Sequence, residues 1–349
     1  MKKIVDSAFI IVILTLILIP IFSMNLEPDQ VSKVENRKLA EKPVCSQGYT
    51  HYMNDLNTYI NDRIGQRDNM MHFFNFLQHG MMKTNHDQVL YGKNDWLFYR
   101  DDISDYTGSN MDPSLIKRQV DIITALDQWC KERNIQFILA IGPNKSSVYY
   151  DYMPPSIFHC PKTSVDHTVE ALRENGVAVA YPKKELIAHR MDKQLYYPLD
   201  THWNAYGAEY MFYEIAKYLN LPGKEFEYTE TTSYSGDLQN MLGIAYKGEP
   251  ELEVAITPNP QSAIHNVENT PLDLVMKTDG AIDVICYRDS FTSSLLTYYG
   301  YYFEGPFHWQ YGLDLTEIEE SAPDVVILSC VERYFNHAAE ANAAILNLK

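Results

Sequence analysis

Ser290 stands where a serine hydroxyl could act as a nucleophile. It follows the apolar, strand-like run Ile282–Cys286 and begins a segment that we expect to form a short helix. A serine at such a junction projects its hydroxyl above the edge of the sheet, and backbone N–H groups at the start of the helix can hold an oxyanion. The alternative is a plain helix cap, because Asp289 and Ser290 are both favoured N-cap residues.

Asp200 and His202 could supply the rest of such a site. They are two residues apart, and side chains two apart in an extended segment point to the same side. Imidazole suits the role of general base, and Asp200 can orient the ring. The alternative is a loop that caps the helix expected from Asn204, with His202 in a structural hydrogen bond. Together with Ser290, the pair completes a set of nucleophile, base and orienting carboxylate.

The elements that must position these residues follow from apolar spacing. The segments predicted after residue 110 are, in chain order, helix 113–133, strand 135–141, helix 164–174, strand 177–180, helix 204–219, strand 282–286 and strand 324–330. Near-continuous apolar strands alternating with helices predict an α/β fold with a mostly parallel sheet covered on both faces. In such sheets functional groups gather beyond the carboxyl ends of the strands. Before these segments we expect helices within 49–82 and a hairpin within 89–99.

The composition limits the possible classes of function. Hydrophobic residues make up 46% and charged residues 21% of 349, which is typical of a globular protein. The formal net charge is -17, and no cluster of Lys and Arg suited to phosphates is present, so a nucleic-acid partner is not expected. The 11 His residues are scattered, and we expect neither a metal nor a cofactor.

The N-terminus carries a targeting signal. Lys2 and Lys3 precede an apolar run from Ala8 to Met24 that is just long enough to cross a bilayer. We therefore expect a cytoplasmic tail at 1–7, a transmembrane anchor at 8–24, a linker and juxtamembrane helices at 25–85, and a catalytic domain at 86–349. A cleaved signal peptide is the alternative, and either outcome exports the rest of the chain.

A set of motifs in a fixed order resembles a known family. The chain is similar to the DHHW and alginate-acetylation group of SGNH hydrolase-like proteins, of the AlgX and AlgJ type. The family signature Asp-His-His-Trp appears as Asp200-Thr201-His202-Trp203, where Thr201 replaces a His that is not part of the family's triad. The other similar stretches are Glu35–Leu39, Asn61–Arg67, Gly92–Tyr99, Pro143–Lys145, Ser235–Leu238 and Arg288–Phe291.

The resemblance implies a three-layer α/β/α, SGNH-like (flavodoxin-like) fold and a specific chemistry. Ser290 would be the acyl-accepting nucleophile, His202 the base and Asp200 its orienting carboxylate. The remaining candidates for oxyanion or substrate contact are Asn144, Lys145, Arg288 and Asp237. The reaction implied is acetyl transfer to a hydroxyl of an extracytoplasmic polysaccharide, and the partner implied is a multi-pass membrane O-acyltransferase that supplies the acetyl group.

Two other functions stay open. A polysaccharide acetylesterase would use the same triad, with water as the final acceptor. A non-catalytic scaffold or glycan-binding subunit of an envelope assembly would not need the triad at all, and the presence of all three triad residues argues against it.

Overall fold

Two compact units make up the chain. A computed structural model describes residues 9–10, 13–15, 18–27, 31–32, 37–44, 49–75, 86–233, 236–243, 251–257, 264–267, 270–278 and 282–348. The first unit comprises Met1–Val89 and Asp237–Lys247, and the second comprises Leu90–Gly236 and Gly248–Lys349. The domain boundary predicted at residue 86 differs from this division, because residues 237–247 belong to the first unit.

The first unit is mainly helical. Its elements are β1 (Val31–Ser32), β2 (Arg37–Lys38), α2 (Tyr49–Arg63), α3 (Arg67–Asn75) and α10 (Asp237–Leu242). The helical prediction for 49–82 is confirmed up to Asn75, with a break at Gln66, whose φ of 59° is left-handed; residues 76–82 lie outside the described residues. Asp62 and Arg63 are buried at the end of α2, where they bond the backbone N–H and carbonyl of Ala40.

The N-terminal run contains short helical turns in its described parts. Among the described residues, no helix combines the length and apolar character needed to cross a bilayer. The transmembrane helix predicted for residues 8–24 is therefore not supported by the structure.

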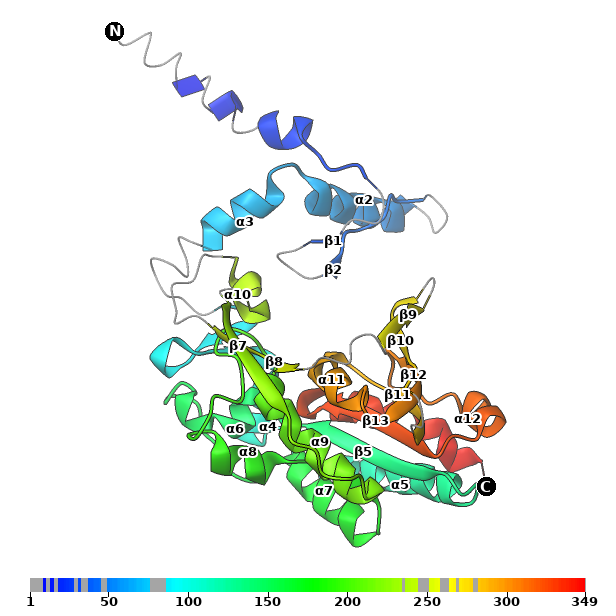
Figure 1. Ribbon diagram of the computed structural model, residues 1–349. Helices are drawn as coiled ribbons and strands as arrows, with labels where there is room; N and C mark the ends of the chain where they lie inside the picture. The colour runs from blue at the N-terminus through cyan, green and yellow to red at the C-terminus, as the bar shows by residue number, and fades with distance from the viewer. Residues whose placement is uncertain are drawn as a thin grey trace. The chain divides into compact units, whose positions relative to one another are not determined.

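A seven-stranded sheet forms the centre of the second unit (Figure 1). In spatial order its strands are β6 (Ala178–Ala180), β5 (Gln136–Gly142), β13 (Val325–Val331), β11 (Ile282–Tyr287), β12 (Phe303–His308), β10 (Thr270–Met276) and β9 (Ile264–Val267). The first five run parallel, whereas β10 runs antiparallel to β12 and to β9. The sheet is therefore mixed, with the predicted parallel part on one side and an antiparallel edge that the sequence did not predict.

Helices cover both faces of this sheet, which confirms the α/β fold. The helices of the second unit are α4 (Ile103–Thr107), α5 (Pro113–Lys131), α6 (Lys145–Val148), α7 (Ser164–Glu174), α8 (Lys183–His189), α9 (Ala205–Leu219), α11 (Leu296–Tyr299), α12 (Leu315–Ser321) and α13 (Phe335–Glu340). Along β5, Phe137, Leu139 and Ile141 pack with α5 and α7 on one face, and Ile138 and Ala140 pack with α9 on the other.

Shorter elements complete the second unit. The 3-10 turns are η2 (Lys93–Asp95), η3 (Arg100–Asp102), η4 (Tyr150–Tyr152), η6 (Ser290–Ser294), η7 (Glu332–Tyr334) and η8 (Ala343–Asn347). The predicted hairpin is present as β3 (Val89–Tyr91) paired with β4 (Leu97–Tyr99), and β7 (Glu227–Ser233) pairs antiparallel with β8 (Glu251–Thr257). Because β5, β11, β12 and β13 are parallel, the residues that follow them leave the sheet at the same edge.

Candidate active site

Ser290 begins η6 at the carboxyl end of β11, and Asp289 fixes its position. The Asp289 carboxylate accepts from the backbone N–H of Phe291 (2.9 Å), from that of Val331 at the end of β13 (2.8 Å) and from the Tyr311 hydroxyl (3.0 Å). Burial raises the pKa of this carboxyl. Asp289 therefore links two strand ends and caps the turn that presents the Ser290 hydroxyl, which is half-buried.

Asp200 and His202 lie in a tight loop between α8 and α9. An isolated bridge pairs Tyr196 with Trp203, and the Tyr197 N–H donates to the His202 carbonyl (3.1 Å). Within the loop, the Asp200 Oδ1 accepts from the backbone N–H of His202 (2.9 Å). The extended conformation expected for this segment is therefore wrong, because the Asp200 side chain closes a turn two residues long. The turn nevertheless directs both side chains to one place.

The three predicted residues form one hydrogen-bonded chain. The Nδ1 of His202 lies 2.6 Å from Asp200 Oδ1, and its Nε2 lies 2.8 Å from Ser290 Oγ. The His202 side chain is 25% exposed, so the site is accessible from solvent. This geometry allows the imidazole to take the proton of the serine while the carboxylate fixes the tautomer of the ring.

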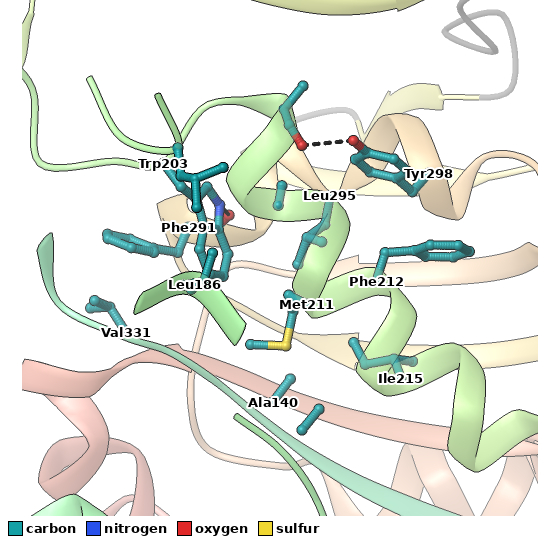
Figure 2. Packing of buried hydrophobic residues seen from close by; sticks show 14 of the residues in the cluster. Ala140, Leu186, Trp203, Met211, Phe212, Ile215, Phe291, Leu295, Tyr298 and Val331 are labelled. Atoms are coloured by element: carbon teal, nitrogen blue, oxygen red, sulfur yellow. Dashed lines mark hydrogen bonds between the residues drawn. The ribbon is translucent and has the colours of Figure 1, made fainter. Parts of the chain in front are cut away.

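An aromatic pair holds the two halves of the site together. The indole N–H of Trp203 donates to the Phe291 carbonyl (3.0 Å), and the two rings meet edge to face at 5.2 Å. The Phe291 ring also lies 4.9 Å from the His202 imidazole. Figure 2 shows Trp203 and Phe291 side by side in the core, above Met211. Each residue neighbours one triad member in sequence, so their contact fixes the distance between His202 and Ser290.

A second contact attaches the Ser290 segment to α9. The hydroxyl of Tyr298 in α11 donates to the carbonyl of Ala205, the first residue of α9 (2.7 Å), which is the bond drawn as a dashed line in Figure 2. The loop with His202 leads directly into α9, and η6 leads directly into α11. The helices after the two catalytic segments are thus joined to each other as well.

Lys145 lies beneath the loop that carries Asp200. Its side chain is buried, with 1% of the residue exposed, and its Nζ donates to the carbonyls of Tyr197 (3.0 Å), Pro198 (3.1 Å) and Asp200 (2.6 Å). A role as substrate or oxyanion contact stays a prediction for this residue. In the structure its three N–H groups all donate to backbone oxygens, so Lys145 supports the loop that carries Asp200.

Asn144 is engaged with buried groups around the ends of β5 and β13. Its Nδ2 donates to Asp105 Oδ2 (3.0 Å), its Oδ1 accepts from the Arg333 backbone N–H (3.2 Å), and its own backbone N–H donates to Glu332 Oε2 (2.9 Å). Asp102 is buried beside them and accepts from a side chain in α6. Nothing in the sequence pattern marked Asp102, Asp105 or Glu332.

Of the two remaining candidates, Arg288 has its side chain bonded away from the triad. Arg288 is buried and donates to the Leu272 carbonyl (2.7 Å), with its guanidinium 4.8 Å from the centre of the Trp309 ring. Burial lowers its pKa. Asp237 is the first residue of α10 in the other unit, so its expected role stays a prediction. The expected absence of a metal and a cofactor also stays a prediction.

Comparison with known proteins supports the relationship suggested by the motifs. Residues 89–275, more than half of the chain, match the family described as an SGNH hydrolase-like domain of the acetyltransferase AlgX. A curated relative, the probable alginate O-acetylase AlgJ of Pseudomonas putida, is 27% identical over 167 residues. That match covers 44% of this chain and 42% of the relative, so the chain spans less than half of the relative's length.

Solved structures share the fold. The O-acetyltransferase domain of Pseudomonas putida AlgJ aligns with a TM-score of 0.50 and 17% identity, covering 75% of this chain and 99% of that domain. Bacillus cereus PatB1 with a sulfonyl adduct aligns with a TM-score of 0.53 and 16% identity, covering 71% and 95%. At these identities the likeness shows the fold alone.

Proposed function

The chain belongs to the SGNH hydrolase-like family of the acetyltransferase AlgX, and from this premise we propose that it is a polysaccharide O-acetyltransferase with an acyl-serine intermediate. One observation carries the proposal: the hydrogen-bonded path from Asp200 through His202 to Ser290, with separations of 2.6 and 2.8 Å. The curated relative is a probable alginate O-acetylase, which favours a glycan acceptor.

In the first half-reaction the Ser290 hydroxyl attacks the acetyl carbonyl of the donor. His202 Nε2 takes the hydroxyl proton as the new C–O bond forms, and returns that proton to the leaving group as the donor's bond breaks. Asp200 stabilises the imidazolium that exists between these two proton transfers. The products are acetyl-Ser290 and the released donor group.

In the second half-reaction a sugar hydroxyl attacks the acetyl-serine. His202 takes the proton of that hydroxyl, the ester to the sugar forms, and the proton returns to the departing Ser290 oxygen. Hydrolysis by an acetylesterase differs only in its acceptor, which is water. The family description favours transfer.

We place this reaction outside the cytoplasm. The apolar run after Lys2 and Lys3 supports export of the chain. The acetyl donor would then have to cross the membrane, and a multi-pass membrane O-acyltransferase is the partner that would supply it. Digestion of the protein by protease added to spheroplasts checks the location, and protection equal to that of a cytoplasmic control protein would contradict it.

Mass spectrometry of the full chain after exposure to 4-nitrophenyl acetate tests the mechanism. We expect an acetyl group on Ser290, and we expect its formation to fail in Ser290→Ala and in His202→Ala. Ser293→Ala is the matched control, because Ser293 lies on the same turn but is exposed, and it should acetylate normally. An adduct on Ser290 that forms equally fast without His202 would contradict the mechanism.

A glycan acceptor added after acetylation separates the candidate functions. Acetate that becomes ester-linked to the sugar identifies a transferase, and acetate that appears only free in solution identifies an esterase. If no residue is acetylated at all, the chain is instead a glycan-binding or scaffold subunit.

A further inference from the structure

Trp309 is an exposed indole at the edge of the sheet that carries Ser290. It directly follows β12, and 37% of it is exposed. Strands β11 and β12 are parallel neighbours with Tyr287 opposite His308, so Trp309 and Ser290 leave the sheet in the same direction from adjacent strands. Adjacent strands lie about 4.8 Å apart, which puts Trp309 within reach of a sugar chain bound at Ser290.

The indole is fixed in place without being buried. The backbone N–H of Trp309 donates to Asp273 Oδ1 (2.7 Å), and the Arg288 guanidinium lies 4.8 Å from the centre of the indole ring. Arg288 is itself buried and held by the Leu272 carbonyl (2.7 Å), and the Leu272 side chain is 51% exposed. A fixed indole presents a flat apolar surface at low entropic cost, which suits stacking against the C–H face of a pyranose ring.

The charge around Trp309 selects the kind of sugar. His308 stands between two carboxylates, 3.0 Å from Glu317 and 3.9 Å from Asp273, whose side chains are 34% and 27% exposed. The whole chain carries a formal charge of -17. The Arg288 guanidinium near the ring is a cation, but it is buried, whereas the two carboxylates are partly exposed. The charge presented to solvent therefore repels a uronate or a phosphorylated sugar and tolerates a neutral one.

We propose that Trp309 is the stacking platform for an uncharged pyranose of the acceptor glycan. This proposal rests on the proposed O-acetyltransferase function and adds a class of acceptor to it. Arg288 then acts through Trp309, by supporting the ring from beneath.

Calorimetric titration of the full chain carrying Ser290→Ala tests the subsite without turnover. The probes are cellohexaose and chitohexaose, which are neutral, and a mannuronate hexasaccharide, which is anionic. We expect a neutral probe to bind, and Trp309→Ala to weaken that binding about tenfold, as for the loss of an aromatic anchor. The matched control is Tyr213→Ala, which removes an aromatic ring of similar exposure (38%) from α9 and should leave the affinity unchanged.

Three results would overturn the proposal: unchanged affinity in Trp309→Ala, failure of both neutral probes to bind, or binding of the mannuronate probe as tight as that of the neutral ones. Failure of the catalytic proposal is distinguishable. If Ser290 takes no acetyl group while Trp309-dependent binding persists, only the transfer chemistry is lost. If Ser290 is acetylated and Trp309→Ala binds normally, only the subsite is lost.

Discussion

Lys145 places a buried ammonium under the backbone of the catalytic loop. Its three donors meet three carbonyls within residues 197–200, and the aromatic rings of Trp96 and Phe98 lie 5.6 and 5.1 Å from its nitrogen. The ammonium therefore determines where the Asp200 backbone lies, and through the Asp200 carboxylate it determines the orientation of His202. Lys145 is a positioning residue, because its ammonium acts on the triad through the backbone carbonyls of the loop.

Lys145→Met should lower kcat for an activated acetyl ester by about a hundredfold, because small displacements of a catalytic group cost that much. KM should change little, since no substrate contact is removed. Lys145→Arg should restore activity only in part, because a planar guanidinium cannot converge on three carbonyls as an ammonium does. The measurement is steady-state kinetics at a temperature where circular dichroism shows each variant folded.

Lys184→Met is the control for the loss of a lysine, because Lys184 is exposed on α8. Lys145 has no role in positioning if the folded Lys145→Met protein keeps the wild-type kcat, or if only KM changes.

At the scale of elements, three strand ends and one loop meet around Gly142. This glycine ends β5, and a Cβ placed there would lie 2.8 Å from the Phe291 ring and 3.0 Å from the Trp203 ring. Both contacts are shorter than a carbon pair tolerates. The absence of a side chain at Gly142 is therefore what allows the two rings to approach the sheet and hold His202 beside Ser290.

Gly142→Ala should therefore impair catalysis more than folding. The added methyl group displaces the Phe291 ring, which lies against His202, and the expected loss in kcat is about tenfold to a hundredfold. The matched control is Gly223→Ala, because a Cβ at Gly223 meets no atom within 4 Å. Kinetics and thermal unfolding of both variants provide the comparison, and unchanged kcat in a folded Gly142→Ala protein would show that the rings adapt.

The elements that the sequence predicted correctly are those with strong apolar patterns. Strands β5, β11 and β13 and helices α5, α7 and α9 lie within two residues of their expected bounds. Strand β12 was missed because Gly305 and Pro306 read as turn residues. Gly305 has φ 135°, and a Cβ there would lie 2.0 Å from the Val284 carbonyl oxygen, so the strand needs glycine for close pairing.

The sequence predicted the residues of the triad but not the contacts that hold them in place. Ser290, His202 and Asp200 could be chosen because their residue types and neighbours suit acyl chemistry, and the structure brings them together. The conformation of the loop was not predictable, since Asp200 bonds locally to the His202 N–H instead of extending. Nor was the burial of Lys145, because lysine is rarely buried and its three acceptors come from residues more than fifty positions away.

At the scale of the whole molecule, buried carboxylates couple the stability of the second unit to pH. Asp102 and Asp105, from η3 and α4, pack against Asn144, Glu332 and Arg333 at the ends of β5 and β13. Burial raises the pKa of Asp102 to about 6. Burial and then the negative charge of Glu332 raise the pKa of Asp105 to about 7. In both cases the folded protein binds the proton more tightly than the unfolded chain does.

The second unit should lose stability as the pH rises, because folding raises the pKa of both carboxyls. A carboxyl whose pKa is raised on folding contributes its stabilisation fully below its unfolded pKa, and that contribution is lost as the pH rises through the folded pKa. Each group should therefore lower the free energy of unfolding by about 1.4 kcal/mol per pH unit within that window. For Asp105 the loss should run up to about pH 7 and then level off.

Asp105→Asn should remove this dependence, because the amide stays neutral over the whole range. Urea unfolding between about pH 5 and pH 8 measures it: the variant should gain stability relative to wild type as the pH rises to about 7. Asp121→Asn is the control, because Asp121 forms only an exposed ion pair with Lys117 and should leave the profile parallel to wild type. A constant difference between Asp105→Asn and wild type across the range would mean that Asp105 keeps the same charge in the folded and unfolded states. In that case Asp105 would attach α4 to the end of β5 through its hydrogen bond with Asn144 and not through a change of charge on folding.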